Sequence, residues 1–473
     1  MTTESTAGAR SHDDRLASAQ RESREASPLP GEHAAAIERL QQLIRIPTVS
    51  RSDESDTDWA PFRRFLEVLP ELYPLVHAKL ERELVANYSM IYRWRGREDG
   101  NPGVLMAHYD VVAATDDGWQ HPPFSAHVSG SADDAVMWGR GTLDDKGSLA
   151  AILEAVEASL SEGFTPKNDI YLCFGHNEET AGDGARQIVD LLEARGIRPG
   201  FVSDEGGAIV EGIFPGVDDP IAVVGVAEKG IMTLTMTVDQ DGGHASTPPR
   251  QTATVRLARA IVALNRTPFP GRFTATNIEM IRTLGAHARG PLRFAFTQLW
   301  LTKPLLLSLF GRLSDETRAI TRTTQAVTML QGAAAENALA ERATAVVNIR
   351  VAVGSSVAEA VAHVKKAVND ERVSIAVERP SEPSIVSPTT GPAWNLVRTS
   401  IERTYPGTIV TPYVMLGASD SRHFTRISDF VYRFSPFEMS ADERGTLHAK
   451  NERIRISTWL RGIDFYREIV AGL

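Results

Sequence analysis

The chain has 473 residues, of which 42% are hydrophobic and 23% are charged, and this is the composition of a folded globular protein. Its 60 acidic residues outnumber its 50 basic residues, so no basic field is present to attract nucleic acid or anionic lipid. The single cysteine, Cys173, excludes an intrachain disulfide and a thiolate zinc site, and it favours a reducing, cytoplasmic setting. At roughly 100–200 residues per domain, two or three units are expected.

Residues 1–30 are rich in Ser, Thr, Glu, Arg and Ala and lack the apolar core of a secretion signal, which predicts a disordered tail. In residues 31–228, short apolar runs alternate with segments of helical periodicity, which predicts an α/β sheet. Residues 229–380 alternate apolar residues with threonine and then turn helical, and we interpret them as an inserted α+β domain. Residues 381–473 are expected to complete the first sheet.

One strongly apolar region, 292–313, is interrupted by charged residues and a proline, too often for a membrane span. Two interpretations stay open. The region forms a pair of helices packed on a domain, or it forms an apolar wall for a hydrophobic substrate or partner. In the first case, the expected core residues are Leu305, Leu306, Leu307, Leu309 and Phe310.

Polar residues follow several of the predicted strands. His108 and Asp110 come after the apolar run 104–107, and loops at the carboxyl ends of strands are where α/β folds hold ligands. A lone His-x-Asp pair is more typical of a turn with a solvated histidine. Asp144 and Asp145 follow a glycine-containing segment and precede a helix, where a simple helix cap is the alternative. A dinucleotide fingerprint is excluded, because Asp144 stands where its third glycine belongs.

Two further pairs of acids occupy similar positions. Glu178 and Glu179 follow the run 170–174, and adjacent acids leaving a buried strand repel each other unless a cation or a proton is present. Asp204 and Glu205 follow another short apolar run, and His448 lies in a polar loop before the last helix. Each motif alone is explained as a loop charge. Together they supply what a dinuclear zinc site requires, namely imidazoles, carboxylates and one carboxylate able to bridge two ions.

In this order, the motifs resemble those of the zinc amidohydrolases and exopeptidases that include glutamate carboxypeptidase, carnosinase, aminoacylase, acetylornithine deacetylase and carboxypeptidase S. The resemblance extends from about residue 33 to residue 473. It implies a zinc-exopeptidase-like mixed sheet flanked by helices, with an inserted α+β dimerisation or lid domain. The acids after residue 203 look most like the branch of carboxypeptidase S and the N-acyl amino acid hydrolases.

The resemblance also implies roles for individual residues. Two zinc ions would be held by five residues: His108 and Asp204 on the first ion, Glu179 and His448 on the second, and Asp144 between them. Asp204 is preferred to Glu205 as the ligand. Asp110 would orient His108, Glu178 would be the general base, and the Asp144–Asp145 peptide bond would be cis. Cobalt or manganese is also compatible with such ligands.

Four more positions resemble substrate-binding residues of the family, and a fifth resembles a residue that acts across a dimer. His244, in the segment 242–249, would reach the partner's active site, and an exposed turn histidine is the alternative. Asn337 and Arg350 would help to hold the substrate. Gly417 and Arg422 belong to a loop whose arginine would bind the substrate carboxylate through both of its oxygens.

The implied function is hydrolysis of an amide bond next to an amino acid with a free carboxylate, by a carboxypeptidase, a dipeptidase or an N-acyl amino acid hydrolase. A metal-bridging hydroxide would attack the amide after Glu178 takes a proton from water. The expected partners are a small-molecule substrate and a second copy of the chain. A deacetylase or desuccinylase of a biosynthetic metabolite is the alternative within the enzymes. A catalytically silent binding protein is a further alternative, against which the complete set of site residues argues.

Overall fold

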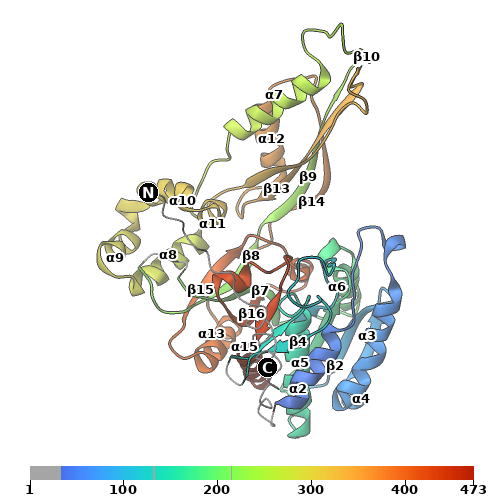
Figure 1. Cartoon of the computed structure of the whole chain (residues 1–473). Coiled ribbons are helices and arrows are strands. Elements are labelled where there is room, and N and C mark those ends of the chain that lie inside the picture. The colour runs from blue at the N-terminus through green and yellow to red at the C-terminus, as the bar shows by residue number, and fades with distance from the viewer. Residues whose placement is uncertain (1–32, 132–133, 213, 215) are drawn as a thin grey trace, which may run out of the picture.

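The computed structural model describes residues 33–131, 134–212, 214 and 216–473, so the tail predicted at 1–30 lies outside the described residues. Figure 1 shows a large sheet surrounded by helices and a smaller sheet that projects from it. The large sheet contains strands from both ends of the chain, and the smaller sheet contains strands from the middle. This arrangement agrees with a zinc-exopeptidase-like fold that carries an inserted α+β domain.

The large sheet has eight strands in the order β1-β2-β6-β3-β7-β16-β8-β15. Their bounds are Glu81–Val85 (β1), Ser89–Trp94 (β2), Gly103–His108 (β3), Ile170–Gly175 (β6), Phe201–Val210 (β7), Ile221–Glu228 (β8), Ile409–Met415 (β15) and Val431–Met439 (β16). Strands β6, β3, β7 and β16 run parallel to their neighbours in this series. Strands β2 and β8 run antiparallel to β6 and β7, so the sheet is mixed as predicted.

Helices cover both faces of this sheet. One face carries α2 (Ala34–Ile44), α3 (Trp59–Leu72), α4 (Pro74–Lys79), α5 (Lys146–Ser161), α13 (Pro392–Thr404) and α15 (Ile456–Gly472), and the other carries α6 (Gly184–Ala194). Successive side chains of a strand point to opposite faces. Accordingly, Leu105 packs in the cluster that contains Leu149 of α5, whereas Val104 and Met106 pack in the cluster that contains Ile188 of α6. Because both faces of β3 are buried, its residues before His108 are all apolar.

The parallel strands bring their carboxyl ends to one edge of the sheet. His108 ends β3 and pairs in register with Gly175, which ends β6, so the residues after both strands meet there. The segment before α5 turns back sharply at this edge. A Cβ atom on Gly147 would lie 2.1 Å from the carbonyl oxygen of Thr142, so only glycine fits at the first turn of the helix.

The smaller sheet has the order β11-β13-β9-β14, and all its pairs are antiparallel. Its strands are β9 (Gly230–Asp239), β11 (Thr324–Gln331), β13 (Arg342–Val351) and β14 (Ser374–Ser381). Alternate residues of β9 are buried beneath α7 (Ala253–Arg266) and α12 (Val357–Val368). The short strands β10 (Gly243–His244) and β12 (Ala338–Leu339) pair beyond this sheet, and Figure 1 shows β10 at the tip farthest from the large sheet. The domain limits 31–228, 229–380 and 381–473 stay predictions.

Part of the inserted segment packs on the large sheet instead. Four helices form this layer: α8 (Ala275–His287), α9 (Gly290–Thr297), α10 (Leu299–Leu313) and α11 (Asp315–Ile320). Leu306 and Phe310 are buried in the core of the large sheet, as predicted. The same prediction was wrong for Leu305 and Leu309, which are 70% and 42% exposed on the outer face of α10. None of the helices in the described ranges combines the length and hydropathy needed for a membrane span.

The last part of the chain returns to the large sheet. Strand β16 inserts between β7 and β8, and α15 packs against α5. Helix α14 (Ala441–Arg444) and the loop after it lead to β17 (Arg453–Arg455), which pairs with β5 (Val136–Trp138) next to β4 (His127–Ser129). The loop that contains His448 is thereby held beside the segment 139–145.

Candidate metal centre

The first group of candidate ligands lies at the carboxyl end of β3. The Nε2 atom of His108 is 2.9 Å from Oδ1 of Asp144 and 3.5 Å from Oε1 of Glu205. The ligand atoms of these three residues all lie within 4.8 Å of one another. His108 is buried, with 1% of its surface exposed. One imidazole and two carboxylates are therefore gathered where a single divalent ion would contact all three.

The second group shares one residue with the first. The Nε2 atom of His448 is 2.9 Å from Oδ2 of Asp144 and 3.0 Å from Oε2 of Glu179. These ligand atoms also lie within 4.8 Å of one another. The two oxygens of Asp144 thus face different histidines. This is the arrangement of a carboxylate that bridges two ions ~3.5–4 Å apart.

The electrostatics of the group fit bound cations. Burial, followed by the charge of Asp144, raises the pKa of the Glu205 carboxyl to about 8. Burial also raises the pKa of Glu178 and of Glu179 above the ordinary range. In addition, Oε1 of Glu179 is buried without a hydrogen-bond partner among the described residues. Several buried carboxylates thus lie together with few cationic side chains near them. A pair of divalent ions would compensate their negative charge.

Asp110 links the histidine of the first group to the loop after β6. Its Oδ1 lies 3.3 Å from Nδ1 of His108, on the side of the ring away from Asp144. The backbone amides of Glu178 and Glu179 donate hydrogen bonds to its two oxygens at 3.1 and 3.2 Å, and Ser50 donates a third bond at 2.7 Å. A carboxylate in this position fixes the orientation of a histidine ligand. The orienting role of Asp110 stays a prediction.

The structure places Asp204 and Glu205 differently. Asp204 was predicted as a ligand of the first ion and stays a prediction, whereas the group around His108 contains Glu205. The Oδ2 atom of Asp204 instead accepts a hydrogen bond from the backbone amide of Ser421 at 2.8 Å. The reason is the alternation of side chains along β7, because neighbouring residues of a strand point to opposite sides. Adjacent acids cannot be distinguished from the motif alone.

The predicted base and one predicted arginine lie together. Glu178 begins the short helix η3 (Glu178–Thr180) after β6, and its Oε1 is 4.0 Å from Nη2 of Arg422. Arg422 lies in the short helix η4 (Asp420–Arg426), which follows Gly417. Arg350, on β13 of the smaller sheet, is close enough to Arg422 for the two charges to influence each other. Burial and then Arg422 lower the pKa of Arg350. Two guanidinium groups from different domains therefore converge beside Glu178.

Two other predicted residues lie away from this centre. His244 is exposed on β10, where its Nδ1 accepts a hydrogen bond from the backbone amide of Ser246 at 3.1 Å. The carbonyl oxygen of Asn337 accepts a hydrogen bond from the amide of Ala245 at 3.0 Å. His244 and Asn337 thus share the tip of the smaller domain (Figure 1). Within one subunit, neither residue is part of the group around Asp144.

One structural residue of the site was not predicted. Glu452 is fully buried, and its Oε1 accepts hydrogen bonds from the backbone amides of Gly141, Leu143 and Asp144. Its Oε2 pairs with Arg140 at 2.6 Å, and Arg140 also donates to the carbonyl oxygen of Ala449. The peptide bond between Asp144 and Asp145 is cis, as the resemblance implied. Glu452 and Arg140 therefore connect the loop of Asp144 to the loop of His448.

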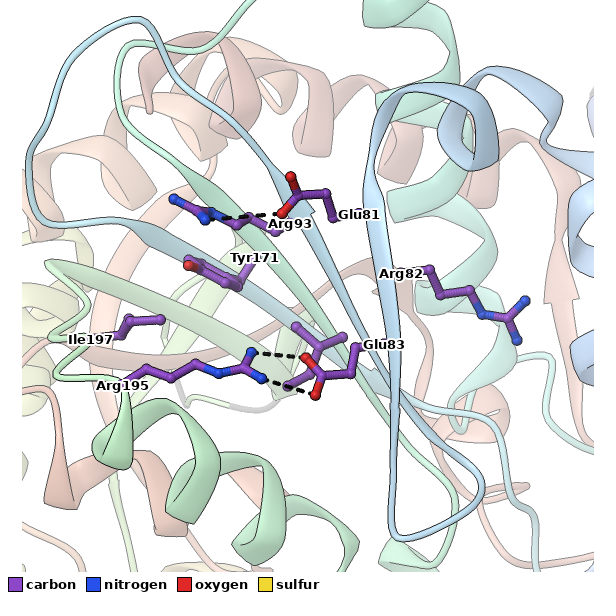
Figure 2. Close-up of a pocket in the computed structure, with 8 residues that line it drawn as sticks. Glu81, Arg82, Glu83, Arg93, Tyr171, Arg195 and Ile197 are labelled. Carbon is purple, nitrogen blue, oxygen red and sulfur yellow. Dashed lines mark hydrogen bonds and ion pairs between the residues drawn. The ribbon is translucent and has the colours of Figure 1, made fainter.

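A surface hollow of about 600 Å³ lies over β1, β2 and β6, toward the edge of the large sheet that β1 forms (Figure 2). Glu83 pairs there with Arg195 at 2.8 Å, and Glu81 lies 3.9 Å from Arg93. Figure 2 shows Tyr171 between these two pairs. Because the charges are paired with each other and no predicted ligand lines the hollow, it is not part of the metal centre.

Comparison with known proteins identifies the family. A model of peptidase family M20/M25/M40 matches residues 104–472. The chain is a member of the M20 peptidase family. "Probable carboxypeptidase S-like 2" of Dictyostelium discoideum is 36% identical over 441 residues, which cover 92% of this chain and 84% of that protein. The human N-fatty-acyl-amino acid synthase/hydrolase is 34% identical, over 95% of this chain and 90% of that protein.

A solved structure shares the fold of this M20 peptidase. The M20 family metallo-carboxypeptidase of Sulfolobus solfataricus superposes with a TM-score of 0.68 at 17% identity, over 92% of this chain and 98% of that chain. The family assignment makes the protein a metallohydrolase that acts on peptide or linear amide bonds. The carboxypeptidase S branch expected from the sequence is confirmed by the names of its relatives.

Proposed function

We propose that this M20 peptidase hydrolyses the amide bond next to an amino acid with a free carboxylate, as a carboxypeptidase, a dipeptidase or an N-acyl amino acid hydrolase. The observation that carries the proposal is the position of Asp144 between His108 and His448, at 2.9 Å from each, with Glu178 in the loop that also carries Glu179. The names of its relatives, carboxypeptidase S and N-fatty-acyl-amino acid synthase/hydrolase, support the same class of substrate.

The proposed cofactor is a pair of divalent ions, with zinc preferred and cobalt or manganese compatible. The first would be held by His108 and Glu205, the second by Glu179 and His448, and both by Asp144. Such ions, when bound, polarise an amide carbonyl and lower the pKa of water toward ~7.

Glu178 is the proposed general base. It is placed between the candidate ligand Glu179 and the buried Asn177, and its backbone amide is fixed by Asp110 at 3.1 Å. Burial raises its pKa, which brings a carboxylate closer to the range in which it exchanges protons at neutral pH. The side chain would take a proton from water and later return it to the leaving amine.

Arg422 and Arg350 are proposed to bind the substrate carboxylate. Among the described residues, the ion pair recorded for Arg422 is the long one with Glu178, at 4.0 Å, and its Nε is buried without a hydrogen-bond partner. A planar guanidinium with free donors binds both oxygens of a carboxylate. The loop of Gly417 is fixed on its other side, because the amide of Ser419 donates to Glu228 at 2.8 Å.

The proposal includes a homodimer in which His244, with Asn337 beside it, acts on the partner's substrate. His244 would donate a hydrogen bond to the developing oxyanion. Strand β11 forms an edge of the smaller sheet, and its Met329 and Leu330 are 56% and 64% exposed. An exposed apolar edge strand is suited to pairing with a second chain. We also propose a cytoplasmic location, from the single cysteine, which is unpaired and buried.

The test is release of free amine from a panel of N-acetyl amino acids, long-chain N-acyl amino acids, dipeptides and N-succinyl diamino acids. Metal content is measured in the same preparations, before and after chelation. Chelator-sensitive release of an amino acid from the first three classes supports the proposal. Activity confined to the N-succinyl diamino acids would replace it with the desuccinylase alternative. Silence on every member, with two metals bound, would overturn it.

A further inference from the structure

A cavity of about 470 Å³ lies between part of the helical layer α8–α11 and the large sheet. Strands β7 and β8 form its floor, and Met280, Leu284 and Phe310 of the helices form its roof. Phe214 closes one side, in edge contact with Phe310 at a ring distance of 6.2 Å. The apolar region 292–313 thus contributes to a wall of this cavity through Phe310, on the buried face of α10.

Two residues that line the cavity are sequence neighbours of candidate metal ligands. Gly206, which lines it, directly follows Glu205 of the first group, and Leu447, which also lines it, directly precedes His448 of the second group. Gly206 is solvent-exposed and Leu447 is 37% exposed, so this end of the cavity is open. From Gly206 the floor continues along β7 to Val210, a span of about 13 Å at ~3.3 Å per residue.

The lining selects for an aliphatic ligand. Its polar members are few. Arg444 and Glu316 lie 3.7 Å apart and are partly exposed, the hydroxyl of Thr317 donates to the carbonyl oxygen of Phe310 at 2.8 Å, and Tyr413 adds one phenol. A peptide bound here would bury amide groups that find few partners, at a cost for each unpaired group. An alkyl chain has no such groups to satisfy, and it gains from leaving water.

We propose that this cavity binds the aliphatic chain of an N-acyl amino acid substrate. The inference rests on the proposed function, because the amide must lie at the metal centre while Arg422 and Arg350 hold the carboxylate. The acyl chain then enters between Gly206 and Leu447 and runs along β7 beneath Leu284 and Phe310. The enzyme is accordingly an N-acyl amino acid hydrolase that selects long acyl chains, rather than a dipeptidase.

The first experiment compares N-acetyl-, N-octanoyl- and N-palmitoyl-phenylalanine. Each buried methylene contributes a roughly fourfold preference, so kcat/KM for the long chains should exceed that for acetyl by at least about 100-fold. Turnover of all three with no preference for length would overturn the cavity inference and leave the proposed function intact. Failure to cleave any N-acyl amino acid or dipeptide would overturn the proposed function itself.

A matched pair of variants locates the preference. Leu284→Trp fills the cavity, whereas Leu305→Trp makes the same substitution on the exposed outer face of α10. We expect Leu284→Trp to lower kcat/KM for the palmitoyl substrate by at least about tenfold and to leave the acetyl substrate within about twofold. Leu305→Trp should change neither. An equal loss on both substrates in folded Leu284→Trp protein would contradict the inference.

A binding measurement decides the question without turnover, including the case in which Leu284→Trp does not fold. Ile320, which lines the cavity, is replaced in an Ile320→Cys, Glu178→Gln double variant, and the rate of maleimide labelling is followed. The native Cys173 is buried and serves as the background. N-palmitoyl-phenylalanine should slow labelling at least about fivefold, and N-acetyl-phenylalanine should not. Labelling at an unchanged rate with saturating palmitoyl ligand would overturn the inference.

Discussion

Glu452 accepts a hydrogen bond at 3.2 Å from the backbone amide of Asp144, the residue shared by both groups of candidate ligands. Burial raises the pKa of the Glu452 carboxyl, whereas Arg140 and the amides of Leu143 and Gly141 favour its charged form. The pair joins two loops that are more than three hundred positions apart in the sequence. The position of Asp144 therefore depends on Glu452, which is not itself a candidate metal ligand.

Glu452→Gln should destabilise the fold and weaken metal binding together. The substitution removes one charge from a pair that is fully buried, which typically costs about 3 kcal/mol. Urea unfolding of the metal-free protein gives the free energy, and metal titration gives the affinity. Glu162→Gln, which breaks an exposed pair with Arg467, is the control and should cost less than about 1 kcal/mol. Equal effects of the two substitutions would contradict the structural role of Glu452.

Glu178→Gln should lower kcat by about 10²–10⁴ and leave the metal content unchanged. The amide is the same size as the carboxylate, but it cannot accept a proton from water. Steady-state kinetics and elemental analysis of the same preparation check the two halves of this prediction. Near-normal turnover would remove Glu178 from its role, and loss of a metal would move it among the ligands.

Glu205→Ala should remove one of two bound metals, whereas Asp204→Asn should retain both. The first substitution deletes a member of the group around His108, and the second keeps an oxygen that can accept from Ser421. Metal stoichiometry after dialysis against a weak chelator distinguishes the two variants. The reverse result would restore Asp204, the ligand chosen from the sequence.

His244→Ala and Glu178→Ala subunits should each be inactive alone and regain activity when mixed. In such a heterodimer, one of the two sites has an intact Glu178 and an intact His244 from the other subunit. Refolding an equimolar mixture should restore roughly one quarter of wild-type activity, because half the dimers are mixed and each has one complete site. A mixture that stays inactive would show that His244 does not act in the active site of the partner.

Lys229→Met should change how stability depends on pH. Burial and the nearby Arg350 lower the pKa of Lys229 to about 7, whereas in an unfolded chain it is about 10.4. Between these values the unfolded state binds a proton that the folded state does not, so this group makes stability rise with pH, by at most about 1.4 kcal/mol per unit. The free energy of unfolding of the wild type, minus that of Lys229→Met, should grow by about 2 kcal/mol from pH 7 to pH 9.

The control for this prediction is Lys167→Met, at an exposed lysine that lies 3.7 Å from Glu98. Because Lys167 is exposed, this substitution should change stability over the same pH window less than Lys229→Met does. If the difference for Lys229→Met is constant, Lys229 is charged in the folded protein at neutral pH.

The sequence predicted the parts of the site that depend on order along the chain. His108, Asp144 and Glu179 follow strands or precede a helix, and parallel strands bring such positions to one edge of the sheet. His448 was placed through the resemblance, since nothing local shows that its loop lies against the segment before α5. Glu205 was not chosen from the sequence because the motif contains two adjacent acids, and only the register of β7 decides which one faces His108.

The long-range packing of the inserted segment was not predictable from its composition. Leu305 and Leu306 have the same hydropathy, yet one is 70% exposed and the other 2%. The position of α10 on the large sheet decides which face is buried, and helical periodicity within a uniformly apolar run does not reveal it. For the same reason, the apolar run 292–313 indicated a wall for a hydrophobic ligand, but not which of its residues line the cavity.

Strand β16 lies between β7 and β8, although it is made long after them. A ribosome that has finished β8 must still add all of 229–430 before β16 begins, which takes about 10–40 s at 5–20 residues per second. Until then β7 can pair with β3 but lacks its second parallel neighbour, β16, and the loop that contains His448 does not exist. The catalytic domain therefore completes its fold only after translation is nearly finished, and the early half depends on protection from aggregation in the interval.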